Sequence, residues 1–244
     1  EYGGFSKNGR EYVIILEKEK STPLPWVNVI ANQSFGTVIS EAGSSFSWSQ
    51  NSREYKLSPW SNDPLLDTSG EAIYLKEEDT KKFWSPMPQP IRNKNPYIIR
   101  HGQGYSVFEH TSNTLYQETT VFVPLKHNLK IVKLKLKNLK NLPRKIYAYY
   151  YIEWVLGVSK DTSAPYLLLE KQEDIVFCRN TYQEEFSGRV AFLTAIGGKY
   201  KSCTADRLNF IGLNSNLTSP LGLQMDELDG NINNIYDPCT AIQI

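Results

Sequence analysis

Residues 131–154, IVKLKLKNLKNLPRKIYAYYYIEW, indicate the fold class of this 244-residue chain. In the first part, apolar residues alternate with lysines, which is typical of a strand with one buried and one solvated face. The second part, from Ile146 to Trp154, is rich in strand-forming residues and also places its apolar members on one face. Asparagine and proline break the pattern between them, so we expect these two runs to form a β-hairpin.

The same reasoning predicts further strands along the rest of the chain. They are separated by short turns, including a charged turn at 76–81, and no window of a dozen residues has helical spacing. The expected strands are 12–16, 72–75, 82–84, 105–110, 115–123, 175–179, 190–195 and 208–211. This pattern predicts an all-β fold, a large antiparallel β-sandwich with little helix, in a single domain over residues 1–244.

Composition excludes several classes of function. Lysine and arginine number 27 against 26 acidic residues, a net charge of +1, which argues against a broadly cationic nucleic-acid binder. No apolar run approaches the roughly 20 residues of a membrane helix, so we expect no membrane contact by this chain. Its three cysteines are widely spaced, which favours reduced thiols and a cytoplasmic location. We expect no metal site, because the histidines lack ligand spacing.

Residues 20–70 break the alternation, and we expect a long loop there. Long loops inside a compact domain are usually functional or disordered, and the aromatic content of this one argues for order. Its densest part mixes aromatic rings with amide, carboxylate and guanidinium groups, which suits a sugar ligand. The candidate substrate-binding residues are Trp48, Arg53, Trp60, Asn62 and Asp63. The alternative is a structural Ω-type loop in which the polar residues only make turns.

A second candidate cluster comprises Arg100, His101 and Gln103. The glycines at 102 and 104 allow close backbone approach or positive φ, and the basic side chains could hold an anion or a sugar hydroxyl. A phosphate loop is weakly supported, because no helix is expected to follow. The alternative is a bulge or turn between edge strands. No pair of carboxylates can be assigned to glycosidic bond cleavage from the sequence.

Blocks of residues spread over nearly the whole chain are distinctive as a set. They are 28–32 (NVIAN), 35–36, 40–43, 48, 53–54, 57–64 (LSPWSNDP), 70–72, 83–86 (FWSP), 100–106 (RHGQGYS), 151–157 (YIEWVLG), 177–180, 188–192, 206–207 and 237–239. Together they resemble the amino-terminal domain of glycoside hydrolase family 94, also classified as glycosyltransferase family 36. Within that family they are most similar to cyclic β-1,2-glucan synthases and β-1,2-oligoglucan phosphorylases.

The resemblance implies a galactose-mutarotase-like supersandwich, with an (α/α)6 catalytic barrel expected to follow Ile244. That barrel would hold the catalytic residue, so no catalytic residue is expected in this chain and the chain alone should be inactive. No cofactor is implied, although inorganic phosphate would be a co-substrate of a phosphorylase. The implied partners are a β-glucan oligosaccharide, the barrel and a second copy in a homodimer. A synthase parent would be anchored at the inner membrane.

Three functions remain open at this point. The first is a non-catalytic carbohydrate-binding and docking domain of a family 94 enzyme, lining the sugar site of the barrel. The second is an autonomous carbohydrate-binding module, and the third is a purely structural dimerisation domain. A barrel encoded directly after Ile244 would distinguish the first from the second.

Overall fold

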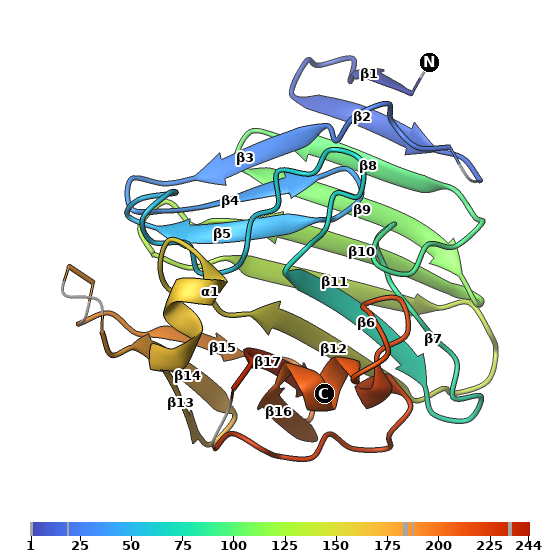
Figure 1. The fold of residues 1–244 in the computed structure, drawn as a ribbon. Coiled ribbons are helices and arrows are strands. Elements are labelled where there is room, and N and C mark those ends of the chain that lie inside the picture. The colour runs from blue at the N-terminus through green and yellow to red at the C-terminus, as the bar shows by residue number, and fades with distance from the viewer. Residues whose placement is uncertain (1, 19, 183–184, 187, 234–235) are drawn as a thin grey trace.

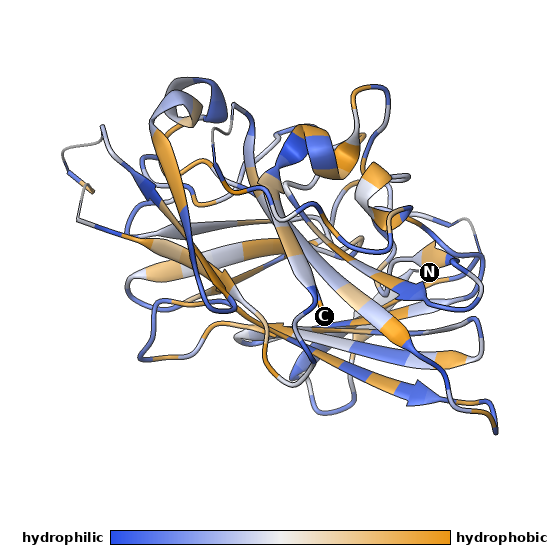
Figure 2. Cartoon of the chain, turned by 90° about the horizontal axis from the view of Figure 1, so that it is seen from below, coloured by the Kyte–Doolittle hydropathy of each residue, from blue (hydrophilic) through white to orange (hydrophobic). Residues whose placement is uncertain are grey.

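The computed structural model describes residues 2–18, 20–182, 185–186, 188–233 and 236–244. This part of the chain forms layered β-sheets whose strand pairs are antiparallel (Figure 1). The longest helix in these ranges has five residues. The predicted all-β class is therefore confirmed. Hydrophilic and hydrophobic segments alternate along individual strands, as a sheet with two different faces requires (Figure 2).

The two larger sheets have six and five strands. The six-stranded sheet runs in the order β1 (Gly3–Phe5), β2 (Glu11–Leu16), β8 (Tyr97–Gly102), β9 (Tyr105–Ser112), β10 (Leu115–Phe122) and β11 (Ile131–Asn138). The five-stranded sheet runs in the order β16 (Ser202–Asp206), β17 (Pro238–Gln243), β12 (Ile146–Glu153), β6 (Glu71–Glu77) and β7 (Phe83–Trp84).

Two three-stranded sheets and four short helices make up the other elements of the described ranges. One sheet is β3 (Val27–Ala31), β4 (Phe35–Ser40) and β5 (Ser45–Ser49). The other is β13 (Leu167–Gln172), β14 (Ile175–Asn180) and β15 (Ala191–Thr194). The helices are α1 (Lys160–Ser163), α2 (Arg207–Ile211) and the 3-10 turns η1 (Ala164–Tyr166) and η2 (Leu221–Leu223).

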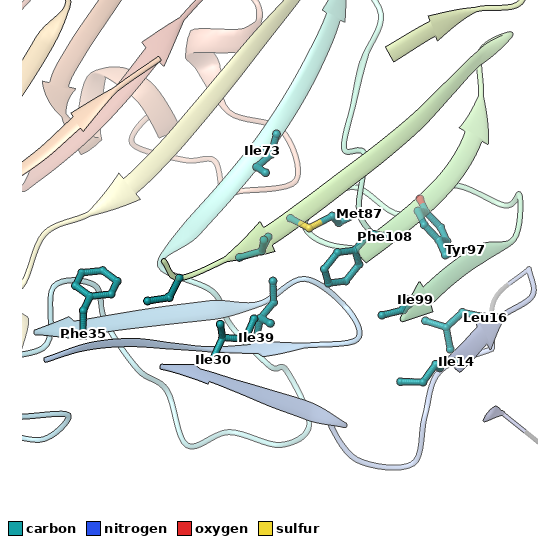
Figure 3. Close-up of a cluster of buried hydrophobic side chains, with 12 residues drawn as sticks. Ile14, Leu16, Ile30, Phe35, Ile39, Ile73, Met87, Tyr97, Ile99 and Phe108 are labelled. Atoms are coloured by element: carbon teal, nitrogen blue, oxygen red, sulfur yellow. The ribbon is translucent and has the colours of Figure 1, made fainter. Parts of the chain in front are cut away.

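One of the hydrophobic cores lies between the β3–β5 sheet and the six-stranded sheet (Figure 3). Ile30 and Ile39 contribute from the smaller sheet, and Tyr97, Ile99 and Phe108 contribute from the larger one. All five side chains are nearly inaccessible to water. Because side chains of a strand alternate between faces, this core forces the intervening residues of β3, β4 and β5 to point outward.

The expected hairpin of residues 132–137 with 146–154 is wrong. β11 pairs with β10, whereas β12 pairs with β6 and β17 in a different sheet. The chain therefore changes sheet across residues 139–145. Alternation of apolar and polar residues identifies a strand. It does not identify the neighbouring strand, because the backbone groups that form the hydrogen bonds are the same in every residue. β12 is covered on both faces: Tyr147, Tyr149 and Tyr151 are buried on the face opposite to the one expected to be apolar, on which Ile146, Ala148 and Tyr150 are only partly buried.

Two further predictions need correction. Residues 208–211 belong to helix α2 rather than a strand, because the Asp206 side chain accepts a hydrogen bond from the Leu208 amide and caps the first turn. Residues 20–70 are not one long loop, since they contain β3, β4 and β5. The charged turn expected at 76–81 begins later, because Lys76 and Glu77 are buried members of β6.

Candidate functional site

The outer face of the β3–β5 sheet carries a row of aromatic side chains. The centroid of the Phe46 ring lies 5.4 Å from that of Trp48 and 5.6 Å from that of Trp60. Trp48 covers Gly36 of the paired strand β4, where an added Cβ would meet the indole at 2.2 Å. We call Phe46, Trp48 and Trp60 the aromatic row. The glycine is needed so that the indole can lie flat on the sheet.

Exposed aliphatic side chains extend this row. Val27 and Val29 of β3 are 53% and 60% exposed, and Leu65 and Leu66 are 89% and 65% exposed. The segment that carries the two leucines is tied to β4 by a hydrogen bond from Ser40 Oγ to Asp67 Oδ2. We call the aromatic row together with these four residues the apolar face. Such a concentration of exposed apolar side chains is typical of an interaction surface.

The structure joins only part of the first predicted cluster. Trp48 and Trp60 both belong to the aromatic row. Asn62, two residues after Trp60, is exposed. Asp63 closes a local turn, because its Oδ1 accepts the backbone amides of residues 65 and 66 at 2.9 and 3.1 Å. Arg53 is 85% exposed and lies 3.3 Å from Glu54. The assignment of these residues to substrate binding stays a prediction.

A buried polar network lies on the opposite side of β5. Glu71 accepts hydrogen bonds from Ser47 (2.9 Å), Ser58 (2.6 Å) and Tyr150 (2.6 Å). Its Oε2 also lies 2.6 Å from the Lys130 ammonium. Burial alone would raise the pKa of Glu71, but Lys130 and the hydroxyl donors outweigh it and lower that pKa. Glu71 is therefore an ionised carboxylate, and its hydrogen bond with Ser47 holds β5 on the core side of the sheet.

The second predicted cluster is divided between the two faces of β8. Arg100 lies on the outer face, where its guanidinium contacts Glu109 and lies 3.7 Å from Glu11. His101 lies on the inner face, because successive residues of a strand alternate. Gln103 is exposed in the turn between β8 and β9. Both strands are interior members of the six-stranded sheet, so the alternative of a turn between edge strands is wrong in that respect.

His101 acts as a link between two elements. Its Nδ1 lies 2.8 Å from Ser106 Oγ, and its Nε2 lies 3.1 Å from the backbone oxygen of Trp26. Burial lowers the pKa of His101, with partial compensation from the Trp26 carbonyl. A neutral ring that accepts from Ser106 and donates to Trp26 satisfies both contacts. The histidine therefore positions Trp26, and neither ring nitrogen is left over for a ligand.

A groove of about 570 Å³ opens beside this link. It lies between the turn that joins β1 to β2, strand β3 and the turn that joins β8 to β9. Aromatic and polar side chains share its lining, including Phe5, Tyr12, Trp26, Asn28, His101 and Gln103. In the described ranges, no cluster of three potential ligands could hold a metal ion. Nor does any helix of those ranges have the length and apolarity to cross a membrane.

Comparison with known proteins decides the family. The model of the glycosyl hydrolase 94 supersandwich domain matches residues 10–244. The chain belongs to this family. It is 36% identical to the cyclic β-(1,2)-glucan synthase NdvB of Rhizobium meliloti (strain 1021), over 99% of this chain and 9% of that protein. It is 27% identical to the N,N'-diacetylchitobiose phosphorylase of Vibrio proteolyticus, over 99% of this chain and 31% of that protein.

The supersandwich therefore spans less than a third of the length of either relative. A third relative, the 3-O-β-D-glucopyranosyl-β-D-glucuronide phosphorylase of Paenibacillus borealis, is 30% identical over 59% of this chain and 17% of that protein. The names of these relatives are those of a glucan synthase and of phosphorylases, and the resemblance recognised in the sequence is confirmed.

Sequence reasoning missed two features of this supersandwich. Trp26 and Asn28 were expected in a loop, yet they line the groove. Glu71 looked like an ordinary carboxylate, yet it is buried with five donors around it. The stretch SFSWS at 45–49 held a signal for the second feature. Its serines alternate with aromatics as in a strand, and buried serines require a polar partner behind the sheet.

Proposed function

We propose that this chain is the non-catalytic docking and carbohydrate-facing domain of a family 94 enzyme that acts on β-glucans. The observation that supports it most is the apolar face. Trp60 is 54% exposed, and a tryptophan buries roughly 150–250 Å² when fully covered. Covering the exposed half would contribute about 2–3 kcal/mol at about 25 cal/mol per Å². A partner surface is the simplest source of that cover, and the proposed partner is the catalytic barrel.

The ion pairs of two buried carboxylates, Glu77 and Glu153, support a non-catalytic role. Glu77 lies 2.7 Å from the Arg144 guanidinium, and Glu153 lies 2.9 Å from both Lys160 and Arg207. Glycosidic bond cleavage requires a carboxyl group free to exchange a proton at a cleft. Ion-paired, enclosed carboxylates are poor candidates for that role. We therefore assign catalysis to the remainder of the parent polypeptide.

The substrate class follows from the relatives. A β-linked glucan, with β-1,2 linkages as in the name of the synthase relative, is the proposed substrate of the parent enzyme. Inorganic phosphate is its co-substrate if it is a phosphorylase. A homodimer is part of the same proposal. The segment from Trp48 to Pro64 would border the sugar site or the subunit contact that shapes it.

The test uses the polypeptide that joins this chain to its catalytic domain. Trp60→Ala and Arg53→Ala are each expected to lower kcat/KM by about tenfold, equivalent to about 1.4 kcal/mol. The Arg53 side chain is 85% exposed, so the melting temperature of Arg53→Ala should hardly change. Trp60→Ala should also lower the melting temperature, because it removes apolar contact with the barrel. Leu213→Ala is the matched control, because Leu213 is 82% exposed and lies after α2. It should leave kinetics unaltered.

A purely structural domain gives the opposite result. Stability would fall in the variants while the kinetics of the remaining folded enzyme stayed the same. Unaltered kinetics in Arg53→Ala, Trp60→Ala and Asp63→Ala together would refute the functional role of this segment.

A further inference from the structure

The groove at the β8–β9 turn has a wall of three aromatic rings. Phe5 and Tyr12 meet edge to face, with ring centroids 5.1 Å apart and planes at 89°. Tyr12 and Trp26 meet in the same way at 5.8 Å and 74°. Phe5 remains 76% exposed at the end of a three-residue edge strand. Most of the Phe5 ring is therefore open for a ligand to cover.

The backbone on both sides of Trp26 is held in place. Its amide donates to Glu41 Oε2 at 2.7 Å, and its carbonyl oxygen lies 3.1 Å from His101 Nε2. Glu41 also accepts the Thr22 hydroxyl, so the carboxylate is itself positioned. The indole is thus presented to the groove by a rigid backbone. Fixing a ring before binding reduces the entropy lost when a ligand stacks on it.

The opposite wall is held just as firmly. Asn28 Nδ2 donates to the backbone oxygens of Gly102 and Tyr105, both at 2.9 Å, and lies 3.1 Å from Ser106 Oγ. These contacts fasten β3 to the turn between β8 and β9. Gln103 stands exposed in that turn, where its amide can both donate and accept. The groove therefore combines fixed aromatic rings with a free amide.

The charges of the groove favour a neutral ligand. Arg10 and Glu11 both line it, and Glu11 lies beside Arg100, which also contacts Glu109, so the two cations are balanced by two carboxylates. Its volume of about 570 Å³ falls in the range of about 300–1,000 Å³ typical of small-molecule sites. Aromatic faces take the C–H surfaces of sugar rings, while amides and charged groups bind hydroxyls. This combination does not suit a phosphate, which would need an excess of donors and positive charge.

We propose that this groove is a glycan-binding site that takes a short, neutral, β-linked gluco-oligosaccharide and operates in the 244-residue chain by itself. The choice of glucose rests on the proposed function, whereas the site itself rests on the groove. The groove lies at the β3 edge of the β3–β5 sheet, where it shares Val27 and Val29 with the apolar face, and the aromatic row lies at the β5 edge. A glucan chain held in the groove would be retained on the enzyme between catalytic events.

The test is calorimetric titration of the 244-residue chain with β-1,2-linked gluco-oligosaccharides. We expect saturable binding with a Kd tighter than about 10 mM. Phe5→Ala and Gln103→Ala should each weaken binding by at least about fivefold, and both positions are exposed, so folding should persist. Tyr236→Ala is the matched control, because Tyr236 is 95% exposed and is not among the residues that line the groove. It should bind as the unaltered chain does.

Three results would overturn the proposal. They are no binding by the unaltered chain, binding that neither groove variant weakens, and equal binding of α-1,4-linked gluco-oligosaccharides. Binding lost in Trp60→Ala but kept in both groove variants would place the sugar on the aromatic row instead, and would also overturn it. The docking proposal is judged separately, from the kinetics of the longer polypeptide, so either proposal can fail without the other.

Discussion

Lys130→Met is the change that most directly tests the network beneath the aromatic row. Lys130 and Glu71 have side chains only 9% and 3% exposed, and the ammonium lies 2.6 Å from the carboxylate. Methionine keeps most of the aliphatic volume of lysine but removes its charge. The variant therefore leaves a buried carboxylate without its cation while disturbing the packing of the sandwich little.

The expected loss follows from the partners that remain. Removing one member of a buried ion pair typically costs about 3–5 kcal/mol. Glu71 would keep hydrogen bonds from Ser47, Ser58 and Tyr150, so we expect a loss near the lower end, about 3 kcal/mol. For a chain of this length, such a loss corresponds to a fall in melting temperature of about 6–12 °C.

The pH dependence gives an independent check. In the unaltered chain the pKa of Glu71 lies below its usual value of 4.5. Its contribution to stability is therefore full above that value and is lost as the pH falls through the native pKa. Without Lys130, burial should dominate and raise the pKa of Glu71 above its usual value. In the variant, Glu71 would then destabilise the fold as the pH rises and its carboxyl group ionises. The difference in free energy of unfolding between the two proteins should therefore be smaller in acid than at neutral pH.

Urea unfolding followed by tryptophan fluorescence, at neutral pH and near pH 5, measures both effects. Lys133→Met is the control, because Lys133 is exposed on β11 and its removal should change stability by less than about 0.5 kcal/mol. The double variant with Glu71→Gln should recover part of the loss. The argument would be refuted if Lys130→Met lowered the free energy of unfolding by less than about 1 kcal/mol. It would also be refuted if the difference in that free energy between the two proteins did not change with pH.

Four further outcomes are expected. Gly36→Ala should displace the Trp48 indole, costing about 1–3 kcal/mol and shifting the fluorescence spectrum; an unchanged spectrum would contradict the packing described. All three cysteines are buried and free, so three thiols should titrate after denaturation without reductant, and a count of one would reveal a disulfide. The imidazole of His101 should titrate below its usual pKa of 6.5, because burial disfavours the charged ring. Its contribution to stability should thus be present above pH 6.5 and fall away in acid, as an NMR titration would report. The 244-residue chain with β-1,2-linked oligoglucan and phosphate should release no glucose-1-phosphate, and turnover abolished by one carboxylate substitution would overturn that expectation.

Local patterns were sufficient for part of the strands. The alternation of lysine with apolar residues at 132–137 and the strand formers at 146–154 predicted β11 and β12 close to their observed bounds, whereas β3, β4, β5 and β8 were not expected as strands. The distributed blocks were sufficient for the family. These properties are local because a strand repeats every two residues, so a few residues specify both its presence and its buried face.

Only the tertiary structure decided how the strands combine. β11 and β12 lie in different sheets although they are neighbours in sequence. At β5 the usual rule is inverted, with serines pointing inward to Glu71 and aromatics outward. Trp26, Asn28 and His101 come together from segments about seventy residues apart in the chain. Residues this far apart in sequence meet only when the sheets cover one another in the folded chain. The sequence of one strand does not specify its partner, because the backbone groups that join strands are the same at every position.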